Sequence, residues 1–166
     1  METVTFGGNP VHTNGNLPAI GSPLPPFTLV GHDLADITGQ DFPGKRIVLN
    51  IFPSLDTGTC AMSVRRFNQM AAAWPDTVVV CVSKDLPFAQ SRFCVTEGIE
   101  NLVTASAFRS SFGDDYGITM VDGPLSGLLA RCVVVADPSG SIAYTNITPV
   151  IEEEPDYEAA AAAVLG

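Results

Sequence analysis

Residues 46–83 have the sequence RIVLNIFPSLDTGTCAMSVRRFNQMAAAWPDTVVVCVS, in which a strand, a helix and a second strand follow one another. Arg46–Phe52 and Thr77–Ser83 are short, mainly apolar runs of the length and composition of buried strands. Between them, Cys60–Trp74 carries apolar residues at helical spacing, which predicts an amphipathic helix. The apolar stripe of this helix consists of Val64, Phe67, Ala71 and Trp74. The segment therefore predicts a β-α-β unit with parallel strands.

The sequence after this unit predicts a mixed sheet. A helix is expected at Pro87–Glu97, begun by its proline and ended by Gly98. The other expected elements are a short strand at Leu102–Ala105, a helical turn at Ser111–Tyr116, strands at Arg131–Ala136 and Ile142–Thr145, and a helix at Glu154–Leu165. The turn Asp137–Gly140 makes the last two strands an antiparallel hairpin. This order predicts an α/β protein with a mixed central β-sheet flanked by helices, and it resembles the thioredoxin fold.

The first 44 residues are rich in Gly, Pro and Asn. Two β-like pieces, Val4–Phe6 and Val11–Thr13, flank the turn Gly7–Pro10 and predict an N-terminal β-hairpin. Gly21–Pro26 is expected to be a stiff extended connector. With 166 residues in total, we expect residues 1–166 to form one domain that includes this hairpin and connector (residues 1–44).

Composition excludes several classes of partner. With 46% hydrophobic and 16% charged residues, the chain has enough apolar material for a full core. Its formal net charge is −10, so it repels phosphate backbones and anionic lipid. We therefore expect no nucleic-acid and no membrane partner. The N-terminus lacks a basic region followed by an apolar one, so we expect no secretory signal. With four widely spaced cysteines, the reducing cytoplasm is the expected location.

Cys60 is the candidate reactive residue. It follows a buried strand and a seven-residue loop and falls in the first turn of the predicted helix, where free N–H groups and the helix dipole favour a thiolate. Thr57 is expected to place its hydroxyl beside the sulfur and to help cap the helix. A small core cysteine beside a capping threonine is the alternative interpretation.

The other cysteines lie in different contexts. Cys81 and Cys132 lie in apolar strand sequence, which favours buried, inert core residues. Cys94 lies in a mixed polar helix, which favours a surface-facing and mobile residue. No C-x₂₋₄-C pair is present and the only histidines are His12 and His32, so we expect no metal site.

Two motifs identify a family. Residues 53–60, PSLDTGTC, have the P-x-x-x-T-x-x-C spacing of the peroxiredoxins. Residues 85–94, DLPFAQSRFC, resemble the second-cysteine helix of the thiol peroxidase subfamily, and residues 122–125 and 127–131 resemble its loop and arginine strand. The resemblance extends over nearly the whole chain.

The resemblance implies an atypical two-cysteine peroxiredoxin without a cofactor. It is expected to be a homodimer that reduces hydrogen peroxide and alkyl or lipid hydroperoxides and is recycled by thioredoxin. By position, Cys60 is similar to the peroxidatic cysteine and Cys94 to the resolving cysteine, with which it forms the redox disulfide. Thr57 and Arg131 match the pair that activates the sulfur, and Pro53 matches the residue that shields it.

The residue types suit this chemistry. When a thiolate attacks one peroxide oxygen, charge develops on the leaving oxygen, and fixed donors aimed there lower the barrier. Arg131, Thr57 and the N–H groups at residues 59–60 are the candidate donors. An ordinary ion pair at the start of a strand is the alternative interpretation of Arg131.

Two other functions are open at this point. A peroxide sensor or relay would carry the same thiols and pass its oxidation to a partner protein. A non-enzymatic binding module of thioredoxin fold would have no need for Pro53, Thr57, Cys60, Cys94 and Arg131 together.

Overall fold

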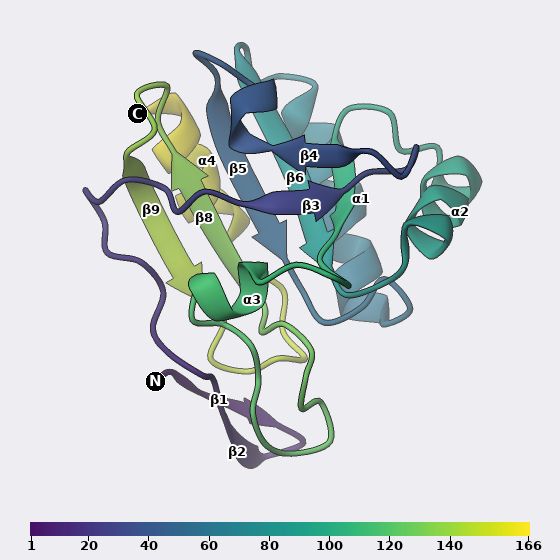
Figure 1. Ribbon diagram of the computed structural model, residues 1–166, viewed down its shortest axis with the longest axis vertical. Coiled ribbons are helices and arrows are strands. Elements are labelled where there is room, and N and C mark those ends of the chain that lie inside the picture. Colours follow the sequence, from purple (N-terminus) through teal and green to yellow (C-terminus); the bar gives the residue numbers. More distant parts are fainter.

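The computed structural model describes residues 1–166, and a seven-stranded mixed sheet in the order β4-β3-β7-β6-β5-β8-β9 forms its centre (Figure 1). The strands of this sheet are β3 (Thr28–Val30), β4 (Asp36–Thr38), β5 (Arg46–Ile51), β6 (Thr77–Ser83), β7 (Val103–Ser106), β8 (Cys132–Ala136) and β9 (Ile142–Ile147). The helices are η1 (Gly39–Asp41), α1 (Gly58–Ala71), α2 (Pro87–Glu97), α3 (Phe112–Asp115) and α4 (Tyr157–Leu165). A separate hairpin pairs β1 (Thr3–Phe6) with β2 (Asn9–His12). None of the helices has the length and apolar character needed to cross a membrane.

The predicted β-α-β unit is confirmed at the centre of the sheet. Strands β5 and β6 are parallel, from the pair Arg46–Thr77 to the pair Ile51–Val82. On its other side β5 pairs antiparallel with β8, and β8 continues into the predicted hairpin with β9. Because both faces of these central strands are covered, their sequences are continuous apolar runs.

Two hydrophobic clusters lie on opposite faces of the sheet. Helices α1 and α4 cover one face (Figure 1). They pack together through Phe67 and Tyr157, whose ring centroids are 5.4 Å apart. On the other, α3 and the connector before β3 cover the sheet through stacked Phe112 and Tyr116 and the edge-on ring of Phe27. Alternate residues of β5 belong to the two clusters, as the two-residue period of a strand requires. Helix α2 packs beside β7, an interior strand of the sheet.

Several predicted boundaries were wrong. Strands β3 and β4 fall in the stretch assigned to the N-terminal hairpin and connector, because each has only three residues and carries little periodic signal. The N-terminal hairpin turns at Gly7 and Gly8 alone, both with positive φ, so the second strand begins at Asn9 rather than Val11.

The predicted helix ends also need correction. Helix α1 begins at Gly58, two residues before Cys60, and ends at Ala71. Helix α4 begins at Tyr157 rather than Glu154, because the Asp156 side chain caps it by accepting from the N–H of Ala159 at 3.0 Å.

Gly117 provides a test of how tightly the N-terminal segment is joined to the turn after α3. Its φ is +70°, and an added Cβ would lie 2.2 Å from the carbonyl oxygen of Asn16. We expect Gly117→Ala to lower the free energy of unfolding by the left-handed backbone cost of about 1–2 kcal/mol and, because of the clash, by about 1–3 kcal/mol more. Urea unfolding measures the loss.

Gly44→Ala is the matched control, because Gly44 has a φ of +72° but open space around its Cβ position. Gly44→Ala should lower the free energy of unfolding only by the cost of the left-handed backbone. Equal losses in the two variants would contradict the close approach to Asn16.

Candidate active site

Arg131 and Cys60 are in direct contact inside the protein. Cys60 is the third residue of α1, and its side chain is fully buried. Arg131 directly precedes β8 and is 2% exposed, and its Nη2 donates to Cys60 Sγ at 3.3 Å. The neighbouring Nε donates to the carbonyl oxygen of Ile151 at 2.9 Å. The loop after β9 therefore sets the direction in which the guanidinium points.

Arg131 has no carboxylate partner. It takes part in none of the three ion pairs of the chain, so the interpretation as an ordinary ion pair is wrong. Its Nη1 is buried without any hydrogen-bond partner. A buried donor in this state carries an unrecovered desolvation cost, which an oxygen atom of a ligand would remove.

A pocket of about 150 Å³ has Arg131 in its wall, with Cys60 buried behind it. One part of its wall is formed by Arg131, Pro53, Thr57 and Thr59. The rest of the wall consists of Ser54, Glu152 and an apolar part that comes from distant segments of the chain, namely Phe6 of the N-terminal hairpin, Leu125, Leu128 and Ile151. Three of the five predicted site residues therefore share one small cavity, with Cys60 bonded to its arginine.

Thr57 is the N-cap residue of α1 but does not cap it with its side chain. Its hydroxyl donates instead to the carbonyl oxygen of Ser54 at 3.1 Å, as does its N–H at 3.2 Å. The capping role predicted from the sequence was wrong: the hydroxyl oxygen accepts no N–H of the helix, and its proton is directed to the turn at residues 54–57 rather than to the sulfur of Cys60. Both bonds tighten the loop that leads to Cys60.

Cys94 lies apart from this pocket. It is a half-buried residue of α2 whose Sγ lies 3.8 Å from Thr104 Oγ1, and all four cysteines are free thiols. Burial raises the pKa of the Cys94 thiol above its ordinary value. It lines a separate pocket of about 250 Å³ together with His32. The sulfurs of Cys60 and Cys94 thus occupy different sites in the reduced protein.

The two remaining cysteines are core residues, as predicted. Cys81 and Cys132 are fully buried, and burial raises the pKa of Cys81 to about 12 and that of Cys132 above its usual range. No group of three or more His, Cys, Asp and Glu side chains is placed to hold a metal ion.

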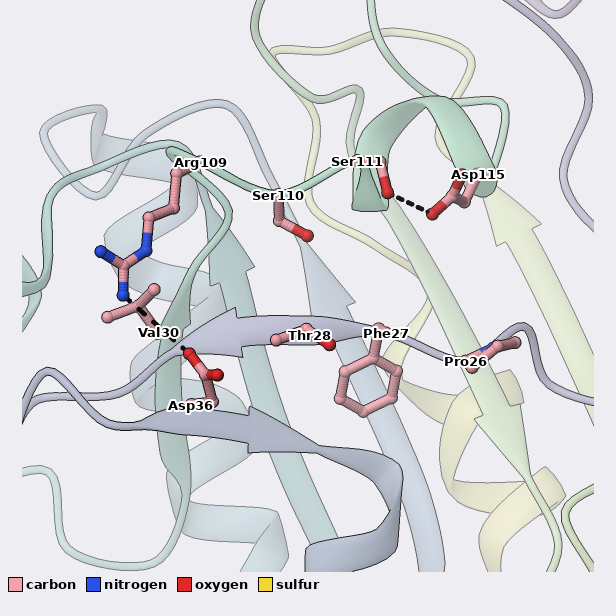
Figure 2. Close-up of a pocket in the computed structure, with 9 residues that line it drawn as sticks. All are labelled: Pro26, Phe27, Thr28, Val30, Asp36, Arg109, Ser110, Ser111 and Asp115. Atoms are coloured by element: carbon pink, nitrogen blue, oxygen red, sulfur yellow. Dashed lines mark hydrogen bonds and ion pairs between the residues drawn. The ribbon is translucent and has the colours of Figure 1, made fainter.

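A larger pocket, of about 470 Å³, lies between β3 and the segment before α3 (Figure 2). In Figure 2 the Arg109 side chain extends toward Asp36, and Ser111 is bonded to Asp115. No cysteine and none of the predicted site residues lines it. It is therefore separate from the site at Cys60.

The sequence analysis did not identify two groups that hold the site in place. The carbonyl of Ile151 orients Arg131, and as a backbone group it has no sequence signal. The carboxylate of Asp85 binds the loop before Cys60, at Ser54 and Leu55. The sequence did contain an indication of this role, because Asp85 follows a buried strand and begins the motif at residues 85–94.

A sulfur beside a buried guanidinium, at the start of a helix in this type of sheet, defines a thiol-based redox protein. The Redoxin family model matches residues 19–161. The chain is 58% identical to the thiol peroxidase of Mycobacterium tuberculosis and 53% identical to that of Corynebacterium glutamicum, with 99% of each chain covered. The chain therefore belongs to the Redoxin family and, within it, to the thiol peroxidases.

Solved structures agree with this assignment. A peroxiredoxin-like protein from Aquifex aeolicus superposes with a TM-score of 0.93 at 37% identity, covering 98% of this chain and 95% of the other. A thiol peroxidase from Chromobacterium violaceum, at 22% identity and a TM-score of 0.89, has the same fold over 96% of this chain and 94% of its own. The resemblance drawn from the motifs and the thioredoxin-like fold are both confirmed.

Proposed function

We propose that this protein is a peroxidase that reduces hydroperoxides with the sulfur of Cys60. The observation that carries the proposal is the buried guanidinium of Arg131, which binds Cys60 Sγ at 3.3 Å and keeps Nη1 without a partner. One cation thus faces both the nucleophile and the place where a substrate oxygen would bind. The names of the relatives support the same reaction.

The chemistry begins with attack of the Cys60 thiolate on one oxygen of the peroxide. A sulfur–oxygen bond forms, the O–O bond breaks, and the other oxygen leaves as hydroxide or alkoxide and takes up a proton. Negative charge grows on the leaving oxygen, so the fixed donors of Arg131 stabilise the transition state. The hydroxyl of Thr57 adds a further donor when it exchanges its bond to the Ser54 carbonyl for one to the substrate. The Cys60 sulfur is oxidised to a sulfenic acid, and the peroxide is reduced to water or an alcohol.

Cys94 completes the reaction in our proposal. Its sulfur displaces the hydroxyl of the Cys60 sulfenic acid, which yields a disulfide within one chain and releases water. Thioredoxin then returns both thiols by thiol–disulfide exchange. Family membership supports this reductant, and we extend the proposal to a homodimer that works in the cytoplasm.

The apolar wall of the pocket supports organic hydroperoxides as substrates. Phe6, Leu125 and Leu128 would contact the carbon chain of such a substrate, whereas hydrogen peroxide has no group to place there.

We expect Leu125→Ala to lower kcat/KM for cumene hydroperoxide relative to that for hydrogen peroxide by about five- to tenfold, because apolar contact is lost. A thioredoxin-coupled assay with both substrates measures the ratio. Val121→Ala, at an exposed residue of the same loop that does not line the pocket, should leave the ratio unchanged. An unchanged ratio in Leu125→Ala would contradict the substrate assignment.

The direct test of the reaction is Cys60→Ser. A serine hydroxyl cannot form a sulfenic acid, so we expect no peroxide consumption in the thioredoxin-coupled assay. Cys132→Ser is the control, because that thiol lies in the sheet away from the pocket. Turnover by Cys60→Ser would refute the proposal. Stoichiometric oxidation of Cys60 in the parent without turnover would identify a sensor or relay instead.

Arg131 and Thr57 should act on the chemical step. One donor to a developing oxyanion is worth about 3–4 kcal/mol, so Arg131→Ala and Thr57→Val should each slow sulfenic acid formation by roughly 10²–10³-fold. Single-turnover oxidation monitored by mass spectrometry measures this rate, with circular dichroism as the check on folding. Parent rates in folded variants would disprove the activation role.

Disulfide formation should require local unwinding. A disulfide needs Cα atoms within about 7 Å of each other, and the two sulfurs occupy separate sites on α1 and α2. With stoichiometric peroxide we expect a species of monomer mass containing a Cys60–Cys94 cross-link. Amide exchange at residues 57–63 and 88–97 should be faster in this species than in the reduced protein. A covalent dimer or a Cys60–Cys81 link would show that Cys94 is not the resolving thiol, and unchanged exchange would disprove the unwinding.

A further inference from the structure

The carboxylate of Asp85 accepts three hydrogen bonds at the end of β6. Its Oδ1 accepts from Ser54 Oγ at 2.8 Å, and its Oδ2 accepts from Leu55 N–H at 2.7 Å and from Ser83 Oγ at 2.6 Å. We call these four residues the Asp85 cluster. Two of its members belong to the loop that leads from β5 to Cys60, so the cluster fastens that loop to the neighbouring strand.

The Asp85 cluster also lies at the start of the helix that carries Cys94. Helix α2 begins two residues after Asp85, and Gln90 of this helix donates to Ser83 Oγ at 3.2 Å. The hydroxyl of Ser106, at the end of β7, donates to the Asp85 carbonyl. One residue therefore joins the two chain segments that have to move when Cys60 and Cys94 meet.

Ser54 connects the Asp85 cluster to the pocket beside Arg131. While the side chain of Ser54 bonds to Asp85, its carbonyl oxygen accepts from the hydroxyl and the N–H of Thr57. Loss of the carboxylate would release the turn that places Thr57 in the pocket wall.

The contact of Asp85 with the loop before α1 is stronger than the ion pair that joins α1 to α2. Hydrogen bonds to a partly buried carboxylate are stronger than neutral ones, and the N–H of buried Leu55 has no other acceptor. The ion pair between Arg65 of α1 and Glu97 of α2 lies at the surface, where solvent screens it. Any unwinding that displaces Ser54 and Leu55 therefore has to break the Asp85 cluster.

We propose that Asp85 is a positioning residue that holds the loop before Cys60 in its peroxide-binding arrangement and opposes the unwinding that disulfide formation needs. This inference rests on the proposed peroxidase function. Asp85 accelerates sulfenic acid formation and slows its condensation with Cys94, and so it sets the lifetime of the sulfenic acid. A long-lived sulfenic acid meets a second peroxide molecule, which transfers one oxygen to the sulfur, giving a sulfinic acid, and leaves as water or an alcohol.

Asp85→Asn tests this role with little change in shape. Rapid mixing with hydrogen peroxide, quenching and mass spectrometry give the rates of sulfenic acid and disulfide formation and the sulfinic acid yield at high peroxide. Because a charge-assisted hydrogen bond corresponds to about a tenfold change in an equilibrium constant, we expect sulfenic acid formation to slow by about tenfold and disulfide formation to accelerate by at least about threefold. The sulfinic acid yield should fall. Ser54→Ala, which removes only one bond of the cluster, should shift both rates in the same directions by less.

Asp137→Asn is the matched control. Asp137 also accepts three hydrogen bonds, from Ser139 and Ser141, in the turn between β8 and β9 away from both cysteines. It should keep the parent rates. Unchanged rates in Asp85→Asn, or slowing of both steps as in a general loss of folding, would overturn the role of Asp85 and leave the peroxidase standing. A parent protein that forms no sulfenic acid would overturn both.

Discussion

The buried guanidinium of Arg131 beside the sulfur of Cys60 is the contact on which the site depends. A cation taken out of water is costly unless its donors are paired, and here Nε is paired with the carbonyl of Ile151, Nη2 with the sulfur and Nη1 with nothing. The fold supports this arrangement from three directions, through α1, the start of β8 and the loop after β9. The central position of β5 between β6 and β8 brings these elements to one end of the sheet.

The central fold was predictable because its signals are local and strong. Continuous apolar runs marked β5, β6 and β8, and helical periodicity marked α1. Strands β3 and β4 were missed, because three residues contain too little periodicity, and only the tertiary fold shows that β3 joins this short hairpin to β7. A side chain also decided the start of α4, where Asp156 takes the capping role after Pro155.

The site was predictable in part. The spacing of residues 53–60 places Pro53 and Thr57 at one pocket with the start of α1, and the motif around residue 131 supplied the arginine. The sequence could not supply the apolar wall, because Phe6, Leu125 and Ile151 come together only through the tertiary fold. Nor could it show which acceptor the Thr57 hydroxyl takes, since that choice depends on the turn at residues 54–57.

The two cysteine-bearing helices differ in how firmly the fold holds them. Helix α1 buries five residues, whereas α2 buries only Pro87 and Gln90 and leaves Phe88 68% and Val95 84% exposed. Since local stability follows the apolar surface that an element buries, α2 unfolds at lower free energy than α1. Cys94 therefore lies on the less firmly packed of the two helices, and Cys60 lies on the one whose packing keeps the sulfur against Arg131. This division suits the proposed reaction, in which the sulfur of Cys60 has to be placed accurately for attack on the peroxide and the helix of Cys94 has to unwind to a larger extent.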